Sequence, residues 1–454
     1  MKDQHIENNN LKSVAFLTLG CKVNSYETDG MQKLFEEAGF EILDFSEKAD
    51  IYIVNTCTVT NIADRKSRQM LHKARKMNKD AIVVAAGCYV QASMDEENGL
   101  DKNIDIIVGN NQKKNIVAIV EEYLMNKKQK QEYIIDIDHV NEFEELGVED
   151  FSEKTGFEKT RAYIKIQDGC NQFCSYCIIP YARGRVRSRS MDSVIEEVEN
   201  LVNNGYKEVV LTGIHLSSYG IDFSKNKESM LLDLILELSK IHKLERIRLG
   251  SLEPRIITER FVQELSKNPK LCPHFHLSLQ SGCDETLKRM NRKYTGKEYK
   301  DKCDLLREYF ENPAITTDVI VGFPGESQEE FAKSYKFIED IGFSKVHVFK
   351  YSVRKGTLAE KLPNQVKNKE KQERSKKLID LATQMQKAYL TSFLGKKEKV
   401  LIEEEVEIDG ITYQLGHNER YIKIAIISKK DLRNQIVNVN IKKILTKEII
   451  YGEI

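Results

Sequence analysis

The sequence lacks long apolar runs, an excess of charge of either sign and any short-period repeat. No apolar stretch approaches the roughly 18 residues that cross a bilayer, and the first ten residues, MKDQHIENNN, have no apolar core of a signal peptide. We therefore expect a cytoplasmic protein with no membrane partner. Because 70 basic residues balance 70 acidic ones, a nucleic-acid partner would have to bind a local basic surface.

The length of the chain and its cysteine content limit the number of domains and the class of protein that we expect. A chain of 454 residues is too long to fold around a single hydrophobic core. At roughly 100–200 residues per domain, this length predicts two to four domains, with three as the central estimate. The nine cysteines are odd in number and lack the dense spacing of a small secreted scaffold. They are expected to be reduced and to serve as metal ligands or core residues.

The N-terminal part alternates strand-like and helix-like segments. The apolar runs 14–20, 50–56 and 81–87 are separated by polar helical stretches, a pattern typical of a parallel sheet covered by helices. We assign this domain to residues 11–125. Residues 126–155 are charged and irregular and are predicted to be a connector.

The central range 156–386 contains six strand candidates separated by helical stretches. This alternation predicts an α/β domain, a partial (βα)6 barrel that is open on one side. The last range, 389–454, alternates apolar with polar residues and predicts a small antiparallel β-barrel. The fold class is therefore α/β, with a parallel sheet, a partial barrel and a small β-barrel in that order.

Between Gly169 and Pro180 the chain reads GCNQFCSYCIIP, which spaces Cys170, Cys174 and Cys177 as C-x3-C-x2-C after the first barrel strand. Three thiolates can hold a four-iron cluster and leave one iron open to another ligand. A structural zinc site would need a fourth ligand that the local sequence does not supply. We therefore predict an iron–sulfur cluster here.

A second set of cysteines follows the three N-terminal strands. Cys21, Cys57 and Cys88 each come directly after one of those strands, and the carboxyl ends of parallel strands meet at one edge of a sheet. They are candidate ligands of a second cluster. The alternative is that they are small core residues at strand ends.

A zinc-like set also occurs at 272–283, in CPHFHLSLQSGC. The strand period of two places His274 and His276 on the face of Ser278 and Gln280, which predicts that they line the inside of the barrel. None of them is predicted to bind metal. The roles of Cys272, Cys283 and Cys303 stay open.

Two local features are candidates for RNA binding. Arg183, Arg185, Arg187 and Arg189 alternate in RGRVRSR, and an extended segment would present all four on one side to a phosphate backbone. The alternative is a solvated loop with internal salt bridges. In the last segment Tyr413 and Arg420 pair an aromatic face with a cation, although tyrosines are also ordinary strand formers.

The C-x3-C-x2-C motif, with Tyr176 between its last two cysteines, resembles the radical S-adenosylmethionine (SAM) enzymes. GCKVNSYET, VNTCTVT and AAGCYVQ, together with VLTGIHLSSYG, FHLSLQSG and DVIVGFPGE, extend the resemblance to the methylthiotransferases over nearly the whole chain. That resemblance implies SAM, two 4Fe-4S clusters, a C-terminal TRAM domain and a reducing electron-donor protein.

By position, Cys170, Cys174 and Cys177 would hold the catalytic, SAM-cleaving cluster, and Cys21, Cys57 and Cys88 the auxiliary cluster that supplies sulfur. The positions expected to meet SAM are Tyr176, Gly213, Ser251, Gln280 and Gly322.

Within this family, CKVNSYE, SLEP and CPHFHLSLQSG resemble the branch that acts on N6-threonylcarbamoyladenosine in tRNA, the MtaB type. The resemblance implies a tRNA anticodon loop as partner and a 2-methylthio product. The alternatives are methylthiolation of a ribosomal protein side chain and an RNA-binding iron–sulfur scaffold without catalysis.

Overall fold

The computed structural model describes residues 13–92, 101–126, 129–147 and 160–454, which form two compact units. The first unit contains the described residues up to 147 together with 168–172 and 177–187. The second contains residues 160–167, 173–176 and 188–454.

The first unit is built on one sheet of six parallel strands in the order β2-β1-β3-β4-β5-β6. The three strands predicted from sequence are the central ones, and the other three have only three residues each. In chain order the strands are β1 (Ser13–Thr18), β2 (Glu41–Leu43), β3 (Ile51–Thr56), β4 (Ile82–Gly87), β5 (Ile106–Val108) and β6 (Gln131–Tyr133). β6 lies within the range predicted as a connector and forms an edge of this sheet.

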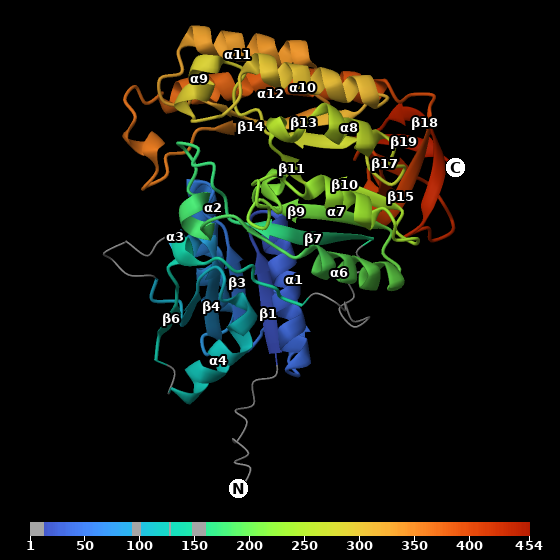
Figure 1. The fold of residues 1–454 in the computed structure, drawn as a ribbon. Helices are drawn as coiled ribbons and strands as arrows, with labels where there is room; N and C mark the ends of the chain where they lie inside the picture. Colours follow the sequence, from blue (N-terminus) through green and yellow to red (C-terminus); the bar gives the residue numbers. More distant parts are fainter. Residues whose placement is uncertain (1–12, 93–100, 127–128, 148–159) are drawn as a thin grey trace. The chain divides into compact units, whose positions relative to one another are not determined.

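Helices cover both faces of this sheet (Figure 1). Helix α2 (Asn61–Met77) packs Leu71 and Ala74 on one face, whereas α1 (Lys22–Glu37) and α4 (Ile116–Met125) pack on the other. Strands β3 and β4 are buried along their whole length, which explains why they read as continuous apolar runs. Three short helices complete the unit: α3 (Cys88–Ala92), η1 (Lys113–Asn115) and η2 (Ile137–His139). A fourth, α5 (Ile179–Arg183), belongs to it although it lies later in the chain.

The second unit contains two four-stranded sheets that together form a partial barrel. The first has the order β10-β9-β7-β8, and the second has the order β11-β12-β13-β14. Their strands are β7 (Arg161–Asp168), β8 (Arg187–Ser188), β9 (Glu208–Gly213), β10 (Arg246–Leu249), β11 (Ser251–Leu252), β12 (His274–Leu277), β13 (Ala314–Val321) and β14 (Lys345–Lys350). All six predicted strand segments are present. The third is broken at Gly250 into β10 and β11, one in each sheet.

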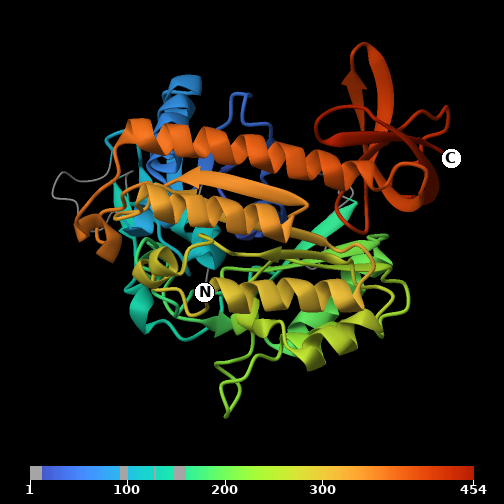
Figure 2. The same ribbon diagram turned by 90° about the horizontal axis from the view of Figure 1, so that it is seen from above.

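The helices between these strands complete the βα alternation. They are α6 (Met191–Asn203), α7 (Leu231–Leu238), α8 (Glu259–Ser266), α9 (Asp284–Arg289), α10 (Gly296–Tyr309), α11 (Gln328–Ile341) and α12 (Asn368–Thr391), with short turns η4 (Leu216–Ser218), η5 (Pro254–Ile256) and η6 (Leu358–Lys361). Helices α10 and α11 begin with capping boxes at Thr295 and Ser327, which satisfy the free N–H groups of their first turns. Helix α11 lies beside both α10 and α12 (Figure 1 and Figure 2).

The C-terminal strands close into a barrel in the order β15-β16-β17-β19-β18. They are β15 (Lys397–Ile408), β16 (Ile411–Asn418), β17 (Lys423–Ile426), β18 (Ile436–Ile444) and β19 (Ile449–Glu453). The small barrel predicted from sequence is therefore confirmed, with one difference: β17 and β19 pair in parallel. Its core includes Leu390 and Phe393 from the end of α12 and its turn.

Within the ranges that the structure describes, no helix has both the length and the apolar character that crossing a bilayer requires.

Candidate functional site

The three N-terminal cysteines lie at the carboxyl ends of three neighbouring parallel strands. Cys21 is the N-cap of α1, Cys57 follows β3, and Cys88 opens α3 directly after β4. Gly20, at φ 103°, packs so closely on Cys57 that a Cβ would lie 2.9 Å from its Sγ atom. The structure thus brings together the set that the sequence predicted, and glycine before Cys21 makes the close approach possible.

The electrostatics of these thiols depend on one another. Burial, together with the charges of Cys88 and Cys21, raises the pKa of Cys57 to about 11. The pKa of Cys21 is also raised, because the protein packed around its thiol outweighs the lowering effect of the positive charge on Arg183. The residue as a whole nevertheless keeps an exposed face. Both groups are thus thiols at neutral pH, and iron must displace their protons to bind.

Arg183, at the end of α5, is in direct contact with this site. Its side chain is fully buried, and its Nε donates a hydrogen bond to Cys88 Sγ at 3.2 Å. The remaining guanidinium nitrogens donate to Glu27 (2.8 Å), Asp168 (3.1 Å) and Asn24 (2.7 Å). This arrangement places a fixed positive charge and an N–H donor against the sulfur.

A second donor reaches the same sulfur. Asn110 Nδ2 lies 3.6 Å from Cys88 Sγ and also donates to the carbonyl of Ala182 at 2.7 Å. The Asn110 side-chain oxygen accepts a hydrogen bond of 2.9 Å from the buried Lys113, which also pairs with Glu27. Hydrogen bonds of this kind orient a metal ligand and stabilise charge on its sulfur.

The four alternating arginines do not form the exposed face predicted for RNA binding. Arg183, Arg187 and Arg189 are 0%, 0% and 1% exposed. The reason is that α5 ends at Gly184, whose φ of 69° breaks the extended conformation. Arg187 donates to the carbonyls of Arg183 and Arg185, and Arg189 pairs with Glu197. Only Arg185 is partly exposed, with an ion pair to Asp138 at 3.2 Å.

The predicted aromatic and cationic pair of the C-terminal barrel is also packed inside the protein. Tyr413 is only 5% exposed and lies edge-on to Tyr451. Arg420 donates to the carbonyls of Asn312 (2.9 Å) and Glu311 (2.8 Å). The expectation that these two side chains present an RNA-binding surface is therefore not supported, because each is engaged in packing within the second unit.

Cys170, Cys174 and Cys177 lie on the loop that follows β7, and all three are half-buried. The backbone of this loop is held at several points: Ser175 N–H donates to the Met290 carbonyl at 3.1 Å, and Asn291 donates to the Phe173 carbonyl at 2.8 Å. All nine cysteines of the chain lie in the described ranges, and none of them forms a disulfide. Three half-buried cysteines on an anchored loop are a ligand set that suits a cluster with one open iron.

The residues predicted to meet SAM lie at the carboxyl ends of the strands of the partial barrel. Gly213 ends β9, Gln280 follows β12 and Gly322 follows β13, whereas Ser251 begins β11 after the break at Gly250 that ends β10. Tyr176, in the cysteine loop, packs edge-on against Phe323 with ring centroids 6.3 Å apart. This is the edge at which barrel active sites are built, so the placement fits the expected role.

Two of the positions expected to meet SAM have a left-handed backbone conformation. Gln280 and Gly322 have φ values of 69° and 71°. A Cβ at Gly322 would lie 2.3 Å from the Lys371 side chain, so only glycine fits there.

Two residues near the cysteine loop escaped the sequence analysis. Arg292 donates to Cys174 Sγ at 3.2 Å and to Tyr294 Oη at 3.0 Å. Burial and the charges of Arg292 and Arg255 lower the pKa of His215 to about 4, so that its ring is neutral at pH 7. Within the described ranges, the buried His215 Nε2 has no hydrogen-bond partner. His215 lies within the VLTGIHLSSYG motif but was given no role. Arg292 lies outside the quoted motifs, and its partner Cys174 is 118 residues away in the chain.

Comparisons with known proteins agree with this geometry. Residues 164–338 match the Radical SAM superfamily, and residues 13–109 match Uncharacterized protein family UPF0004. The chain is 40% identical to the threonylcarbamoyladenosine tRNA methylthiotransferase MtaB of Bacillus subtilis (strain 168), over 95% of this chain and 94% of the relative. It is 41% identical to the MtaB of Aquifex aeolicus (strain VF5), over 86% and 93%.

More distant relatives include the tRNA-2-methylthio-N(6)-dimethylallyladenosine synthase of Alkaliphilus oremlandii (strain OhILAs), which is 32% identical over 95% of this chain and 90% of the relative. Among solved structures, the radical S-adenosylmethionine methyltransferase TsrM from Kitasatospora setae matches with a TM-score of 0.53 and 17% identity, covering 74% of this chain and 73% of that one. This likeness supports the fold assignment.

Proposed function

The chain belongs to the radical SAM tRNA methylthiotransferase family, and on that premise we propose that it adds a methylthio group to C2 of N6-threonylcarbamoyladenosine next to the anticodon of tRNA. The observation that carries the proposal is the 40% identity to a threonylcarbamoyladenosine tRNA methylthiotransferase over nearly the full length of both chains. The proposed partners are tRNA and a reducing electron-donor protein, and the proposed location is the cytoplasm.

The enzyme uses SAM and 4Fe-4S clusters. Cys170, Cys174 and Cys177 are the proposed ligands of the SAM-cleaving cluster, and Cys21, Cys57 and Cys88 those of the auxiliary cluster. When bound, these groups supply the one-electron chemistry and the sulfur needed at an aromatic C–H bond, which has no acidic proton for a base to remove.

The protein contributes orientation and charge. At the N-terminal site, Arg183 and Asn110 donate N–H groups toward Cys88 Sγ and stabilise negative charge on that sulfur. At the other site, Arg292 does the same for Cys174. The neutral ring of His215 leaves one buried nitrogen free in the described structure to meet a polar group at the barrel mouth.

Substrate binding requires the modified base to leave the anticodon stack, at a cost of a few kcal/mol. Among the arginines considered for RNA contact, the side chain of Arg185 is 36% exposed and that of Arg420 is 16% exposed. We propose the division into an auxiliary-cluster domain (11–125), a connector (126–155), a radical SAM core (156–386) and a TRAM domain (389–454), in which β6 of the connector range adds an edge strand to the sheet of the first domain.

The proposal is tested by anaerobic reconstitution with iron, sulfide, SAM and reductant. Two tRNA anticodon stem–loops, one with threonylcarbamoyladenosine and one with isopentenyladenosine, serve as substrates for mass spectrometry of the nucleosides. We expect a methylthio product from the first only. Preference for the second would overturn the substrate assignment, and failure to form 5′-deoxyadenosine would favour a non-catalytic scaffold. Methylthiolation of a ribosomal protein instead of tRNA would point to the other alternative.

A further inference from the structure

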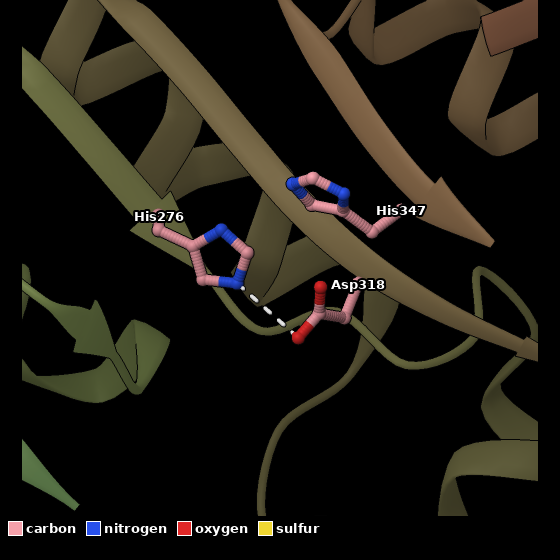
Figure 3. A group of neighbouring side chains, drawn as sticks. All are labelled: His276, Asp318 and His347. Atoms are coloured by element: carbon pink, nitrogen blue, oxygen red, sulfur yellow. Dashed lines mark ion pairs between the residues drawn. The ribbon is translucent and has the colours of Figure 1, made fainter. Parts of the chain in front are cut away.

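Three side chains of types that can bind a metal ion meet on adjacent strands of the second sheet of the partial barrel. His276 is on β12, Asp318 on β13 and His347 on β14 (Figure 3). In the sheet register, Asp318 pairs with His347, and His276 pairs with Thr316, two residues before Asp318. Because side chains alternate along a strand, all three side chains project from the same face.

That face is the inner face of the partial barrel. The neighbouring residue Thr317 projects the other way, where its hydroxyl lies 3.4 Å from Tyr299 Oη of α10. Phe275, next to His276, is fully buried against Phe310 at the end of α10, with ring centroids 5.1 Å apart. The helices thus cover one face of the sheet, and the three ligand residues occupy the other, as the strand period predicted for His276.

The distances suit two ligands of one metal ion better than a hydrogen bond. His276 Nε2 and Asp318 Oδ2 are 3.4 Å apart, which is beyond the usual hydrogen-bond range of about 2.7–3.2 Å. Ligands about 2.0–2.1 Å from a tetrahedral zinc ion lie roughly 3.3 Å from each other. One ligand atom from each of the three residues lies within 4.8 Å of the others, so the three groups converge on one position.

One histidine of the group, His276, is already oriented. His276 Nδ1 is hydrogen-bonded to Thr316 Oγ1 at 2.9 Å, which leaves Nε2 as the atom directed at Asp318 (Figure 3). A metal-binding histidine commonly uses its second nitrogen in this way, because the hydrogen bond fixes both the tautomer and the ring orientation.

We propose that His276, Asp318 and His347 bind a single divalent transition-metal ion, separate from the iron–sulfur clusters. Two imidazoles and a carboxylate are nitrogen and oxygen donors that suit zinc, manganese or ferrous iron. Three protein ligands leave open coordination positions. Because the site is on the inner face, those positions are directed into the barrel, where an oxygen atom of a bound molecule completes the coordination.

The test uses the reconstituted holoenzyme with its clusters oxidised, so that Mn²⁺ alone gives an EPR signal. Mn²⁺ is titrated into the wild type and the His347→Ala and Asp318→Asn variants, and the signal of free aqueous Mn²⁺ is followed. His242→Ala, which alters an exposed histidine outside the site, is the matched control. Circular dichroism and iron content establish that each variant is folded and loaded.

We expect one Mn²⁺ per chain in the wild type and in the control, displaced by Zn²⁺. Loss of a direct ligand should weaken binding by more than the roughly 10- to 100-fold that loss of an outer partner costs. If the wild type binds no Mn²⁺, or if His347→Ala and Asp318→Asn bind it as tightly as the wild type, the three residues are a metal-free polar cluster and the proposal is wrong. Neither outcome depends on methylthiotransferase activity.

Discussion

At the scale of single residues, the most consequential side chain outside the cysteines is Arg183. Its fully buried guanidinium pairs with Glu27 and Asp168 and donates a hydrogen bond to Cys88 Sγ. A cluster held there gains an electron more easily than it would without this positive donor, because hydrogen bonds and nearby charge set the reduction potential of an iron–sulfur cluster.

Replacing Arg183 by Gln should therefore lower the midpoint potential of the auxiliary cluster. It should also destabilise the fold by about 3–5 kcal/mol, because Glu27 and Asp168 lose a buried partner. The potential is measured by an EPR-monitored redox titration in a background of Cys170→Ala, Cys174→Ala and Cys177→Ala, so that one cluster remains. Arg183→Lys keeps the charge and should show a smaller shift in potential.

The matched control is Arg185→Gln, two positions away and partly exposed, which should leave the potential unchanged. An unaltered potential in Arg183→Gln would contradict the role assigned to the guanidinium.

The limits of sequence reasoning are clear at this scale. The cysteines were found because thiols at ligand spacing are rare and their positions follow strand ends. Arg183 was assigned to RNA because Glu27 and Asn24, its partners, lie 156 and 159 residues away in the chain. The sequence RGRVRSR shows how many arginines there are and how they are spaced. Whether their side chains are buried depends on contacts with distant residues, which no local pattern encodes.

At the scale of elements, strands with enough residues to show a period were predictable. β1, β3 and β4 were identified, but β2, β5 and β6 have three residues each and show no pattern. The break between β10 and β11 was also missed. Gly250 N–H donates to the Leu211 carbonyl at 2.8 Å, and a Cβ there would lie 2.9 Å from that oxygen, so the glycine lets the chain pass from one sheet to the other.

The closure of the C-terminal barrel depends on a close approach between β15 and β16. A Cβ on Gly416 would lie 2.1 Å from the Leu401 carbonyl oxygen. Gly416→Ala should therefore destabilise the protein by at least the roughly 1–3 kcal/mol typical of overpacking, as measured by urea unfolding followed by circular dichroism.

Gly296→Ala provides the control for this prediction. Gly296 is the first residue of α10, where the nearest atom to an added Cβ is 3.3 Å away, in the Phe337 ring. Alanine there should be tolerated. Equal stability of the two variants would show that the close approach of β15 and β16 is not needed for the stability of the barrel.

At the scale of the whole molecule, buried arginines of β10 join the partial barrel to the C-terminal barrel within the second unit. Arg248 pairs with Glu208 at 2.7 Å and donates to the Glu419 carbonyl at 2.8 Å. Arg246 donates to the His417 carbonyl at 3.1 Å. The single carboxylate of Glu208 thus compensates cations that hold the two barrels together.

This ion pair predicts a dependence of stability on acid pH. Burial alone would raise the pKa of Glu208, but Arg248, Arg161 and Arg246 lower it to about 2. A lowered carboxyl pKa stabilises the fold at pH values above the ordinary 4.5, and this contribution is lost as the pH falls toward 2. At pH 7 the free energy of unfolding of the wild type should be higher than that of Glu208→Gln by about 3–5 kcal/mol. This difference in stability should shrink below pH 4.5.

Urea unfolding at a series of pH values between 7 and 3 measures this difference, with circular dichroism as the probe because the chain has no tryptophan. Glu245→Gln, a half-exposed carboxylate 4.0 Å from Lys207, should show almost no effect. A difference for Glu208→Gln that stays constant down to pH 3 would contradict the lowered pKa.

The two cysteine sets should separate the two parts of the reaction. Cys57→Ala should retain cleavage of SAM to 5′-deoxyadenosine but lose methylthiolation, whereas Cys174→Ala should lose both. Cys303→Ala, a buried core cysteine, should retain both. Chromatography of 5′-deoxyadenosine and mass spectrometry of tRNA nucleosides measure the two activities. Full methylthiolation by Cys57→Ala would remove Cys57 from the auxiliary site.

The most direct test of the proposed activity is mass spectrometry of nucleosides from the bulk tRNA of a strain in which this gene has been deleted. The strain should lose 2-methylthio-N6-threonylcarbamoyladenosine and accumulate the unmethylthiolated nucleoside, and the wild-type gene should restore the product. An unchanged level of the methylthio nucleoside in the deletion strain would contradict the assignment of this chain to tRNA methylthiolation.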